Sequence, residues 1–362
     1  MSNSRAKSAA ARAPLLLLLL LLSPSSLPAA ALTARPHARP AAARQADGAQ
    51  EAALASLVER ARRGALDDAE FARAVAVGHA LAGGGRHAEA ARLFEALVAA
   101  RPSDRAALYG AALATFNTGR PADAEPLARR AVEAARASGQ KLAAADALVL
   151  LAVVLAVRRD DAGALKASAE AAALAPDSFD AQLTYGRALY GAGDDAGAAR
   201  AFRAATALSP ADARPRFFLA TALERAGDAE GALAAYRELV GLQPRALEGH
   251  LGLGALLVKR GGAEAEEGIR ELLRAAEIDP DNYEARVSLG RALVARGRAA
   301  EAVGHLRRAA ALAPGNPEPH YQLSLAYRKL GRREEAAAES AVVKQIHESR
   351  RGAATAPTAP KP

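Results

Sequence analysis

The sequence contains no cysteine and no tryptophan, and aromatic residues make up only 4% of its 362 positions. The absence of cysteine excludes disulfides, zinc–thiolate sites and cysteine nucleophiles. With so few bulky side chains there is little material for one large globular core, whereas abundant small residues suit closely packed helices. The composition therefore favours an all-α chain that is stabilised by packing between its helices.

The chain also lacks a concentration of charge of one sign. Its formal net charge is +8, from 48 Lys and Arg against 40 Asp and Glu. The basic residues are mostly arginines interspersed with acids, and no dense basic run or basic–aromatic stripe marks a phosphate track. We therefore expect no nucleic acid among its partners.

The amino terminus has the order of a secretory signal peptide. Three basic residues in the first twelve positions precede an apolar run at 15–22, and small residues follow as far as Ala31. Pro24 and Pro28 interrupt the chain well before the roughly 20 apolar residues of a spanning helix. We expect cleavage after Ala31, with Ala34 as the alternative site, followed by a periplasmic or secreted location without a membrane span.

Two low-complexity segments flank the remaining chain. Residues 32–48, with two prolines and several alanines, are expected to form a flexible leader, and residues 350–362 a disordered tail rich in Pro, Ala and Thr. Apolar residues in 49–70 predict one capping helix that covers the amino-terminal end of the folded region.

Regularly spaced prolines reveal an internal repeat. Proline cannot continue a helix interior, so each of them marks a junction between helical units. The five prolines at Pro176, Pro210, Pro244, Pro280 and Pro314 follow one another at intervals of 34, 34, 36 and 34. The interval from Pro102 to Pro176 is 74, which corresponds to two units of 34 with six residues inserted.

Each unit reads as two short helices joined by a glycine turn. In 179–212, apolar residues recur at helical spacing up to Tyr190, Gly193 breaks the run, and a second stripe that includes Phe202 closes at Pro210. Neither helix could bury its apolar face alone. The pairs must therefore stack on their neighbours.

This pattern resembles the tetratricopeptide repeat family. The family combines a large and a small residue in the first helix, a turn glycine, then alanine, an aromatic and alanine in the second helix, and a final proline. In one unit these are Tyr185, Gly186, Gly193, Ala198, Phe202, Ala205 and Pro210.

The resemblance covers 71–349 and implies an all-α, right-handed superhelical solenoid of about eight helix-turn-helix repeats. Three units depart from the pattern: one lacks its closing proline, one has Arg159 at the turn and Ser168 at the aromatic position, and the last has an extended, polar second helix. The predicted units lie near 71–104, 105–138, 145–178, 179–212, 213–246, 247–282, 283–316 and 317–349.

No arrangement of catalytic groups is present in the sequence. There is no phosphate-binding loop, and Gly252-Leu253-Gly254 falls inside a predicted helix without a preceding strand. The histidines have no second ligand at metal-binding spacing, and the paired acids Asp160-Asp161 and Asp194-Asp195 fit helix N-terminal capping. We therefore expect no enzyme activity, no metal and no cofactor.

The resemblance also implies a binding surface. Family members bind extended or helical peptides on the concave face, which is lined by first helices. Aliphatic residues at the inward positions, such as Leu183 and Val287, fit packing between units equally well, and aromatic ones are better candidates for contact. The candidate protein-binding residues are Tyr109, Leu113, Phe116, Arg187, Tyr190, Phe217, Arg291 and Tyr321.

The sequence thus predicts an exported scaffold or adaptor that binds a protein or peptide partner during envelope assembly or secretion. Members of the family that grip the carboxyl terminus of chaperones use lysine and asparagine on these positions, which this chain lacks, so that role is disfavoured. The alternative is a non-catalytic accessory subunit that positions a separate enzyme, such as a glycosyltransferase or a polysaccharide-export component.

Overall fold

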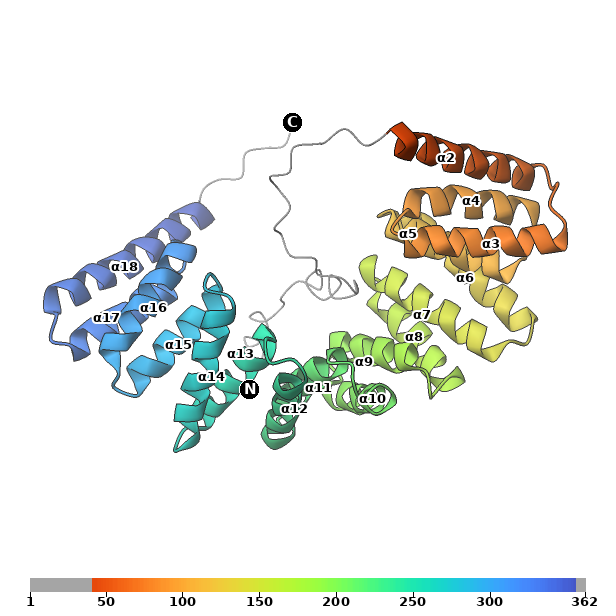
Figure 1. Ribbon diagram of the computed structural model, residues 1–362. Helices are drawn as coiled ribbons and strands as arrows, with labels where there is room; N and C mark the ends of the chain where they lie inside the picture. Colours follow the sequence, from red (N-terminus) through yellow and green to blue (C-terminus); the bar gives the residue numbers. More distant parts are fainter. Residues whose placement is uncertain (1–40, 356–362) are drawn as a thin grey trace. The chain divides into compact units, whose positions relative to one another are not determined.

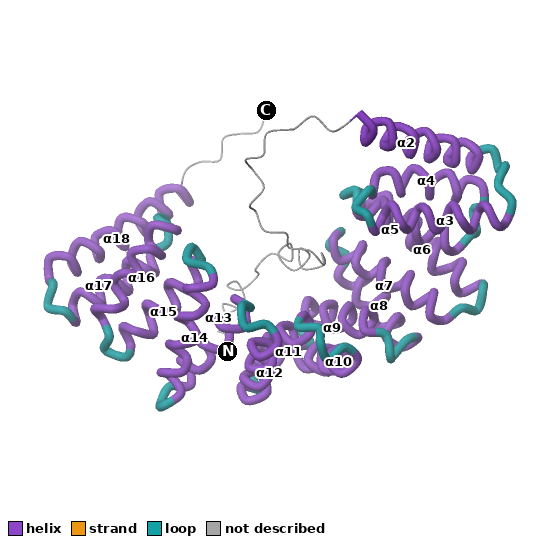
Figure 2. The backbone as a smooth tube through the Cα atoms, viewed as in Figure 1, coloured by secondary structure: helices purple, strands orange, loops and turns teal. Residues whose placement is uncertain are grey.

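The computed structural model describes the backbone of residues 41–355 and the side chains of residues 50–351. Within this part of the chain there are 17 helices, α2 to α18, and no strand (Figures 1 and 2). None of these helices is long and apolar enough to span a membrane. The expected signal peptide and its cleavage site lie outside the described residues. The all-α solenoid predicted from the repeat is confirmed.

The chain divides into two compact units, residues 1–56 and 57–362. The first is described only from residue 41, where it forms most of α2 (Ala41–Arg62). This helix begins inside the range expected to be a flexible leader. Pro40 is the last proline before it, and the residues after Pro40 are mainly alanine, the strongest helix former. The helix ends at Arg62, so residues 63–67 of the predicted 49–70 helix form a loop and its last three residues belong to the next helix, which begins at Asp68.

The second unit of the chain consists of helix pairs. Each pair has a first and a second helix joined by a short turn, as the repeat predicted. The pairs are α3 (Asp68–Gly83) with α4 (His87–Ala100), α5 (Arg105–Asn117) with α6 (Pro121–Ala137), α7 (Lys141–Val157) with α8 (Asp161–Leu174), α9 (Phe179–Ala192) with α10 (Asp195–Leu208), α11 (Arg214–Arg225) with α12 (Ala229–Leu242), α13 (Leu247–Arg260) with α14 (Glu264–Ile278), α15 (Tyr283–Ala295) with α16 (Ala299–Leu312), and α17 (Pro317–Lys329) with α18 (Arg333–Thr355).

Stacking of the pairs creates the core. Every second helix packs against its own first helix and against the first helix of the next pair. First helices also contact the first helices of adjacent pairs, whereas successive second helices make no extensive contact with each other within the described residues. The first helices therefore lie closer together and form one continuous surface, which we call the first-helix face.

Glycine in a first helix makes room for a bulky residue of a neighbouring second helix, in its own pair or in the preceding pair. A Cβ atom on Gly186 would lie 2.6 Å from the ring of Phe202, and one on Gly110 would lie 2.3 Å from the ring of Phe94. Both phenylalanines are completely buried. At these two positions the small residue of the repeat thus records a helix-to-helix approach that leaves no room for a Cβ atom.

The turn inside each pair requires left-handed backbone. Glycine provides it in seven of the eight pairs, for example Gly193 with φ of 83°. The remaining pair has Arg159 there with φ of 65°, the one non-glycine residue with positive φ in the described chain. The turn therefore keeps its left-handed backbone although the sequence pattern lacks glycine at this position.

The six residues inserted between Pro102 and Pro176 extend helices rather than loops. Both α6 and α7 have 17 residues, whereas most of the other paired helices have 13 or 14. Because α7 begins at Lys141, it starts before the predicted limit of the 145–178 unit. No proline separates α6 from α7, and the short segment between Ala137 and Lys141 suffices to join them.

A polar residue six positions after each of the last five repeat prolines bonds to the segment between units or to the second helix of its own pair. Gln182 donates from Nε2 to the Pro176 carbonyl at 3.0 Å, and Nε2 of His250 lies 3.0 Å from the Pro244 carbonyl. The same position also reaches the second helix, as in the 2.6 Å contact between His320 Nδ1 and Glu339. These bonds satisfy carbonyls near the ends of helices that would otherwise lack partners. The five residues are Gln182, Arg216, His250, Arg286 and His320.

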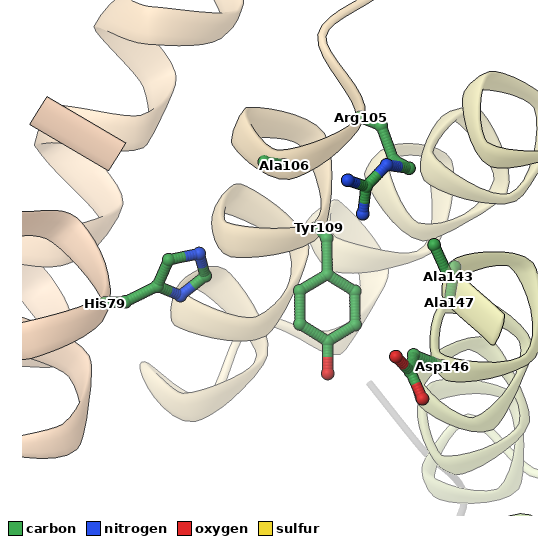
Figure 3. A pocket seen from close by; sticks show the side chains of 7 residues that line it. All are labelled: His79, Arg105, Ala106, Tyr109, Ala143, Asp146 and Ala147. Atoms are coloured by element: carbon green, nitrogen blue, oxygen red, sulfur yellow. The ribbon is translucent and has the colours of Figure 1, made fainter. Parts of the chain in front are cut away.

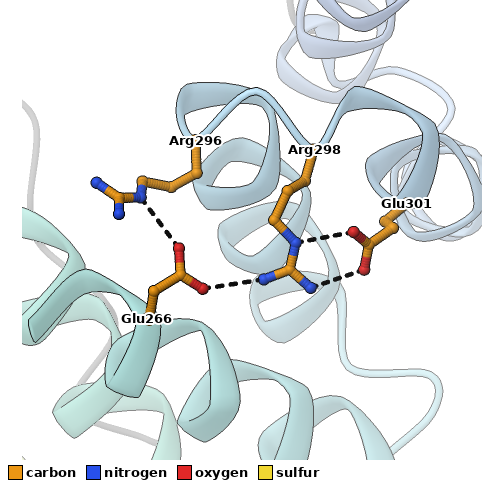
Figure 4. Close-up of polar contacts among 4 residues, drawn as sticks. All are labelled: Glu266, Arg296, Arg298 and Glu301. Atoms are coloured by element: carbon orange, nitrogen blue, oxygen red, sulfur yellow. Dashed lines mark hydrogen bonds and ion pairs between the residues drawn. The ribbon is translucent and has the colours of Figure 1, made fainter. Parts of the chain in front are cut away.

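Ion pairs also join adjacent units at a regular interval. An arginine at the end of a first helix meets an acid at the start of the preceding second helix, as Arg225 does with Asp195 at 3.1 Å. In Figure 4, Glu266 lies between Arg296 and Arg298, and Arg298 also pairs with Glu301. The Arg296 and Glu266 side chains are 40% and 42% exposed, so such a pair contributes little stability alone.

The last helix, α18, continues to Thr355. The first residues of the expected 350–362 tail are therefore helical, and no proline lies between Arg333 and Pro357 to end the helix earlier. Residues 356–362 lie outside the described part of the chain.

Candidate functional site

The predicted binding residues all lie on first helices, at or near the first-helix face. Two of them are exposed, and the side chain of Tyr321 is 51% accessible. The other six are partly buried. The partly buried residues are Tyr109, Leu113, Phe116, Arg187, Tyr190 and Phe217, and the exposed ones are Arg291 and Tyr321.

Aliphatic residues at equivalent positions behave differently. Leu183 and Val287 are buried, with 4% and 5% of their surface exposed. They are core residues, in agreement with the alternative interpretation that such residues serve packing.

Aromatic residues of the second helices provide a comparison. Phe94 and Phe202 have no exposed surface, and Tyr236 is 3% exposed. The aromatic rings on second helices are therefore core residues, whereas those at the predicted positions of the first helices keep part of their surface in solvent. Apolar rings with solvent access are the type of residue that anchors protein partners.

A pocket of about 210 Å³ opens on this face between three successive first helices (Figure 3). Tyr109 of α5 stands in the middle, with His79 of α3 on one side and Asp146 of α7 on the other. The His79 ring meets the buried Phe94 ring edge-on, with centroids 5.1 Å apart, which fixes one wall. The full lining is His79, Arg105, Ala106, Tyr109, Ala143, Asp146 and Ala147.

The pocket has an acidic side. Partial burial, followed by repulsion from Asp180, raises the pKa of Asp146, and the Arg105 guanidinium opposes this effect. Burial together with Asp146 and Asp180 also raises the pKa of the Tyr109 hydroxyl. Asp146 and Asp180 are one repeat length apart in the sequence and therefore occupy the same position on neighbouring first helices. Of these groups, the sequence prediction included only Tyr109.

A second group of polar and aromatic residues lies on α9 and α11. The Arg225 guanidinium stacks 4.2 Å from the centre of the Tyr190 ring, and that of Arg214 pairs with Asp212 at 2.6 Å. Burial, and then the nearby charge of Arg214, lower the pKa of Arg187. Sequence reasoning missed Arg214 and Arg225. The spacing of one repeat length from Asp180 to Arg214 was the available signal.

The paired acids and two of the histidines have structural roles. The Asp160 and Asp194 side chains accept hydrogen bonds from the Gly163 and Gly197 amides, so their interpretation as helix caps is confirmed. Among the described residues, no group of three or more His, Asp or Glu could hold a metal ion. The carboxylates that contact His250 and His320 lie 21 and 19 residues away, on the second helix of the same pair.

Family comparison decides the assignment of the repeats. Two family models described as tetratricopeptide repeat match the chain, one of them over more than half of its length. The first matches residues 75–138, 183–246, 217–267 and 254–317, and the second matches 293–349. The chain belongs to the tetratricopeptide repeat family. Tetratricopeptide repeat proteins bind protein or peptide partners and are generally non-catalytic scaffolds.

Several solved tetratricopeptide repeat structures are similar to about half of this chain. A crystal structure of MamA has 21% identity and a TM-score of 0.45, with 51% of this chain and 98% of MamA covered. YrrB, described as a TPR protein with an unusual peptide-binding site, has 18% identity and a TM-score of 0.45, with 50% and 93% covered. MamA from Desulfovibrio magneticus RS-1 has 18% identity and a TM-score of 0.45, with 47% and 96% covered. A comparison with curated proteins gives no match.

Proposed function

We propose that this tetratricopeptide repeat protein is an exported adaptor that binds a segment of a partner protein on its first-helix face. One observation carries the proposal: the aromatic side chains at the predicted positions keep solvent-accessible surface, whereas Phe94 and Phe202 of the second helices are fully buried. These positions are Tyr109, Phe116, Tyr190, Phe217 and Tyr321. Burying an aromatic ring against a partner provides much of the binding energy in protein interfaces. These rings are spread over several units, as a long peptide segment would require.

Site-specific photocrosslinking tests this function. The crosslinking amino acid p-benzoylphenylalanine replaces Tyr109, Tyr190 or Tyr321 in turn, and the chain is irradiated in cells of its native host. We expect one partner to be crosslinked from all three positions, because they lie on the same face. The matched control is Arg203, which is exposed on the second helix α10. Crosslinks of equal yield from Arg203, or none from the three tyrosines, would contradict the proposal.

Export is supported by the basic, apolar and small-residue order of residues 1–31. We expect the mature chain to begin at Leu32 or close to it. Amino-terminal sequencing of the protein recovered from its host tests this, and recovery of an intact amino terminus from a membrane fraction would show that the segment is an anchor.

A further inference from the structure

The pocket around Tyr109 has a chemical character of its own within the first-helix face. Its volume of about 210 Å³ is below the roughly 300–1,000 Å³ of pockets that enclose small-molecule ligands. A space of this size suits one side chain of a bound polypeptide. The chemical groups that line the pocket then determine which residue it would bind.

The polar groups of the pocket have unused bonding capacity. Among the residues with described side chains, none forms a hydrogen bond or an ion pair with the Tyr109 hydroxyl or the Asp146 carboxylate. An ionised carboxylate is an acceptor only, with two oxygens available to a donor. In Figure 3 the Tyr109 side chain lies between His79 and Asp146.

The local charge favours a cation. Asp146 and Asp180 place two carboxylates near Tyr109, while Arg105 is the one cation that lines the pocket. Partial burial, and then repulsion between the carboxylates, raises the pKa of Asp146. A positive group bound beside Asp146 would relieve that repulsion. An anionic group would instead meet both carboxylates.

The walls also favour a flat cation. Tyr109 supplies an aromatic ring in the middle of the pocket, and the His79 ring lies on the side of Tyr109 opposite Asp146. A guanidinium group is planar, stacks on aromatic faces and donates paired hydrogen bonds to a carboxylate. An ammonium group makes the same charge contact without the stacking geometry.

We propose that this pocket binds an arginine side chain of the partner, with the guanidinium stacked on Tyr109 and hydrogen-bonded to Asp146. The proposal rests on the peptide-binding function proposed above and specifies one residue of the bound segment. It assigns Asp146 as the specificity-determining group and Tyr109 as the stacking surface.

Peptide selection followed by affinity measurement provides the test. Random dodecapeptides displayed on phage are selected on the purified chain, and an enriched peptide is synthesised with a fluorophore for anisotropy titration. Two further versions replace its arginine by lysine or by citrulline, a neutral analogue of the same shape. The proteins are wild type, Asp146→Asn, Tyr109→Leu and the control Asp161→Asn, which removes an equal charge from an exposed site on α8.

We expect the enriched peptides to share an arginine. Its replacement by citrulline should weaken binding to wild type by about fivefold, an effect between those of losing an exposed ion pair and of losing a charge-assisted hydrogen bond. Asp146→Asn should abolish this difference between arginine and citrulline, and Asp161→Asn should preserve it. Tyr109→Leu should bring the affinity for arginine down to that for lysine. Melting curves establish that each variant is folded, so that a change in preference reports the pocket.

Three results would overturn the proposal. Peptides selected without arginine that compete for the first-helix face would contradict the arginine pocket while supporting the proposed function. An arginine preference that persists in Asp146→Asn would show that another group recognises the cation. Absence of any enriched peptide would count against both the pocket and the proposed function.

Discussion

At the scale of single residues, the fold depends on where a side chain is missing. Gly186 lets α9 and α10 approach until the Phe202 ring occupies the space of a Cβ atom. Gly191, in the same helix, has no atom within 4 Å of the corresponding position. Two glycines of one helix therefore have different roles, and only one of them is needed for packing.

Alanine substitution should separate these roles. We expect Gly186→Ala to destabilise the chain by about 1–3 kcal/mol, because the added methyl group overpacks a filled core. Gly191→Ala should be neutral or stabilising by up to about 1 kcal/mol, because alanine is the better helix former in an open position. Denaturant unfolding followed by circular dichroism measures both. Equal destabilisation by the two changes would show that the close approach to Phe202 is unimportant.

A single histidine should make stability depend on pH. Burial, and next the Arg286 guanidinium, lower the pKa of His305 below its ordinary value of 6.5, with a smaller opposite effect of Glu301. Arg286 donates to Nδ1 of His305 at 2.8 Å, so the folded chain favours the neutral ring. A lowered pKa means that this contribution to stability is present above the ordinary pKa and is lost as the pH falls through the folded value.

The variant His305→Gln tests this dependence, since glutamine keeps an acceptor and does not titrate. Wild type should be the more stable protein at about pH 8, and its advantage in melting temperature should shrink on acidification to about pH 5. The comparison between the two proteins removes the contributions of other titrating groups. A difference that is constant over this range would contradict the assignment.

At the scale of helices, the sequence was sufficient to predict where a helix begins or ends wherever proline or glycine marked that boundary. The regularly spaced prolines located the units, and the large–small pair at Tyr185 and Gly186 located a contact between helices. Such residues act through their own backbone, so their effect can be predicted locally.

Features that depend on distant partners could not be predicted in this way. The six inserted residues lengthened α6 and α7, and nothing in their composition distinguished added helical turns from a longer loop. The contact of His250 with Glu271 joins residues 21 positions apart on two helices, a distance that becomes short only after the pair folds. Leu183 is buried and Tyr190 of the same helix is partly exposed, and this difference in burial likewise depends on how closely neighbouring units stack.

The terminal helix pair tests the stacking of elements. Leu323 and Tyr327 of α17 are buried in one cluster with Leu306 of the preceding unit. Deleting 317–362 should expose this cluster, lower solubility and increase binding of a hydrophobic dye. Deleting 352–362 removes only the end of α18 and the residues beyond it, and should change little. Similar behaviour of the two truncations would argue against stability through neighbouring units.

At the scale of the whole molecule, the repeat separates stability from recognition. Second helices place aromatic residues such as Phe202 in the core, whereas first helices contain both buried rings, such as Tyr327, and partly exposed ones, such as Tyr190. Because successive first helices contact one another, their partly exposed residues add up to one extended surface. The chemistry of that surface then varies from unit to unit, from the acidic pocket at Tyr109 to the arginines near Tyr190.

The most direct test of this account compares binding and stability in the same variants. The triple change of Tyr109, Phe116 and Tyr190 to alanine should weaken binding of the crosslinked partner by more than roughly thirtyfold, the effect of a single interface anchor of about 2 kcal/mol. Its melting temperature should stay close to that of wild type. Phe202→Ala should instead lower the free energy of unfolding by about 3–5 kcal/mol. A triple variant that binds the partner normally, or that unfolds as readily as Phe202→Ala, would contradict the assignment of the first-helix face as the binding surface.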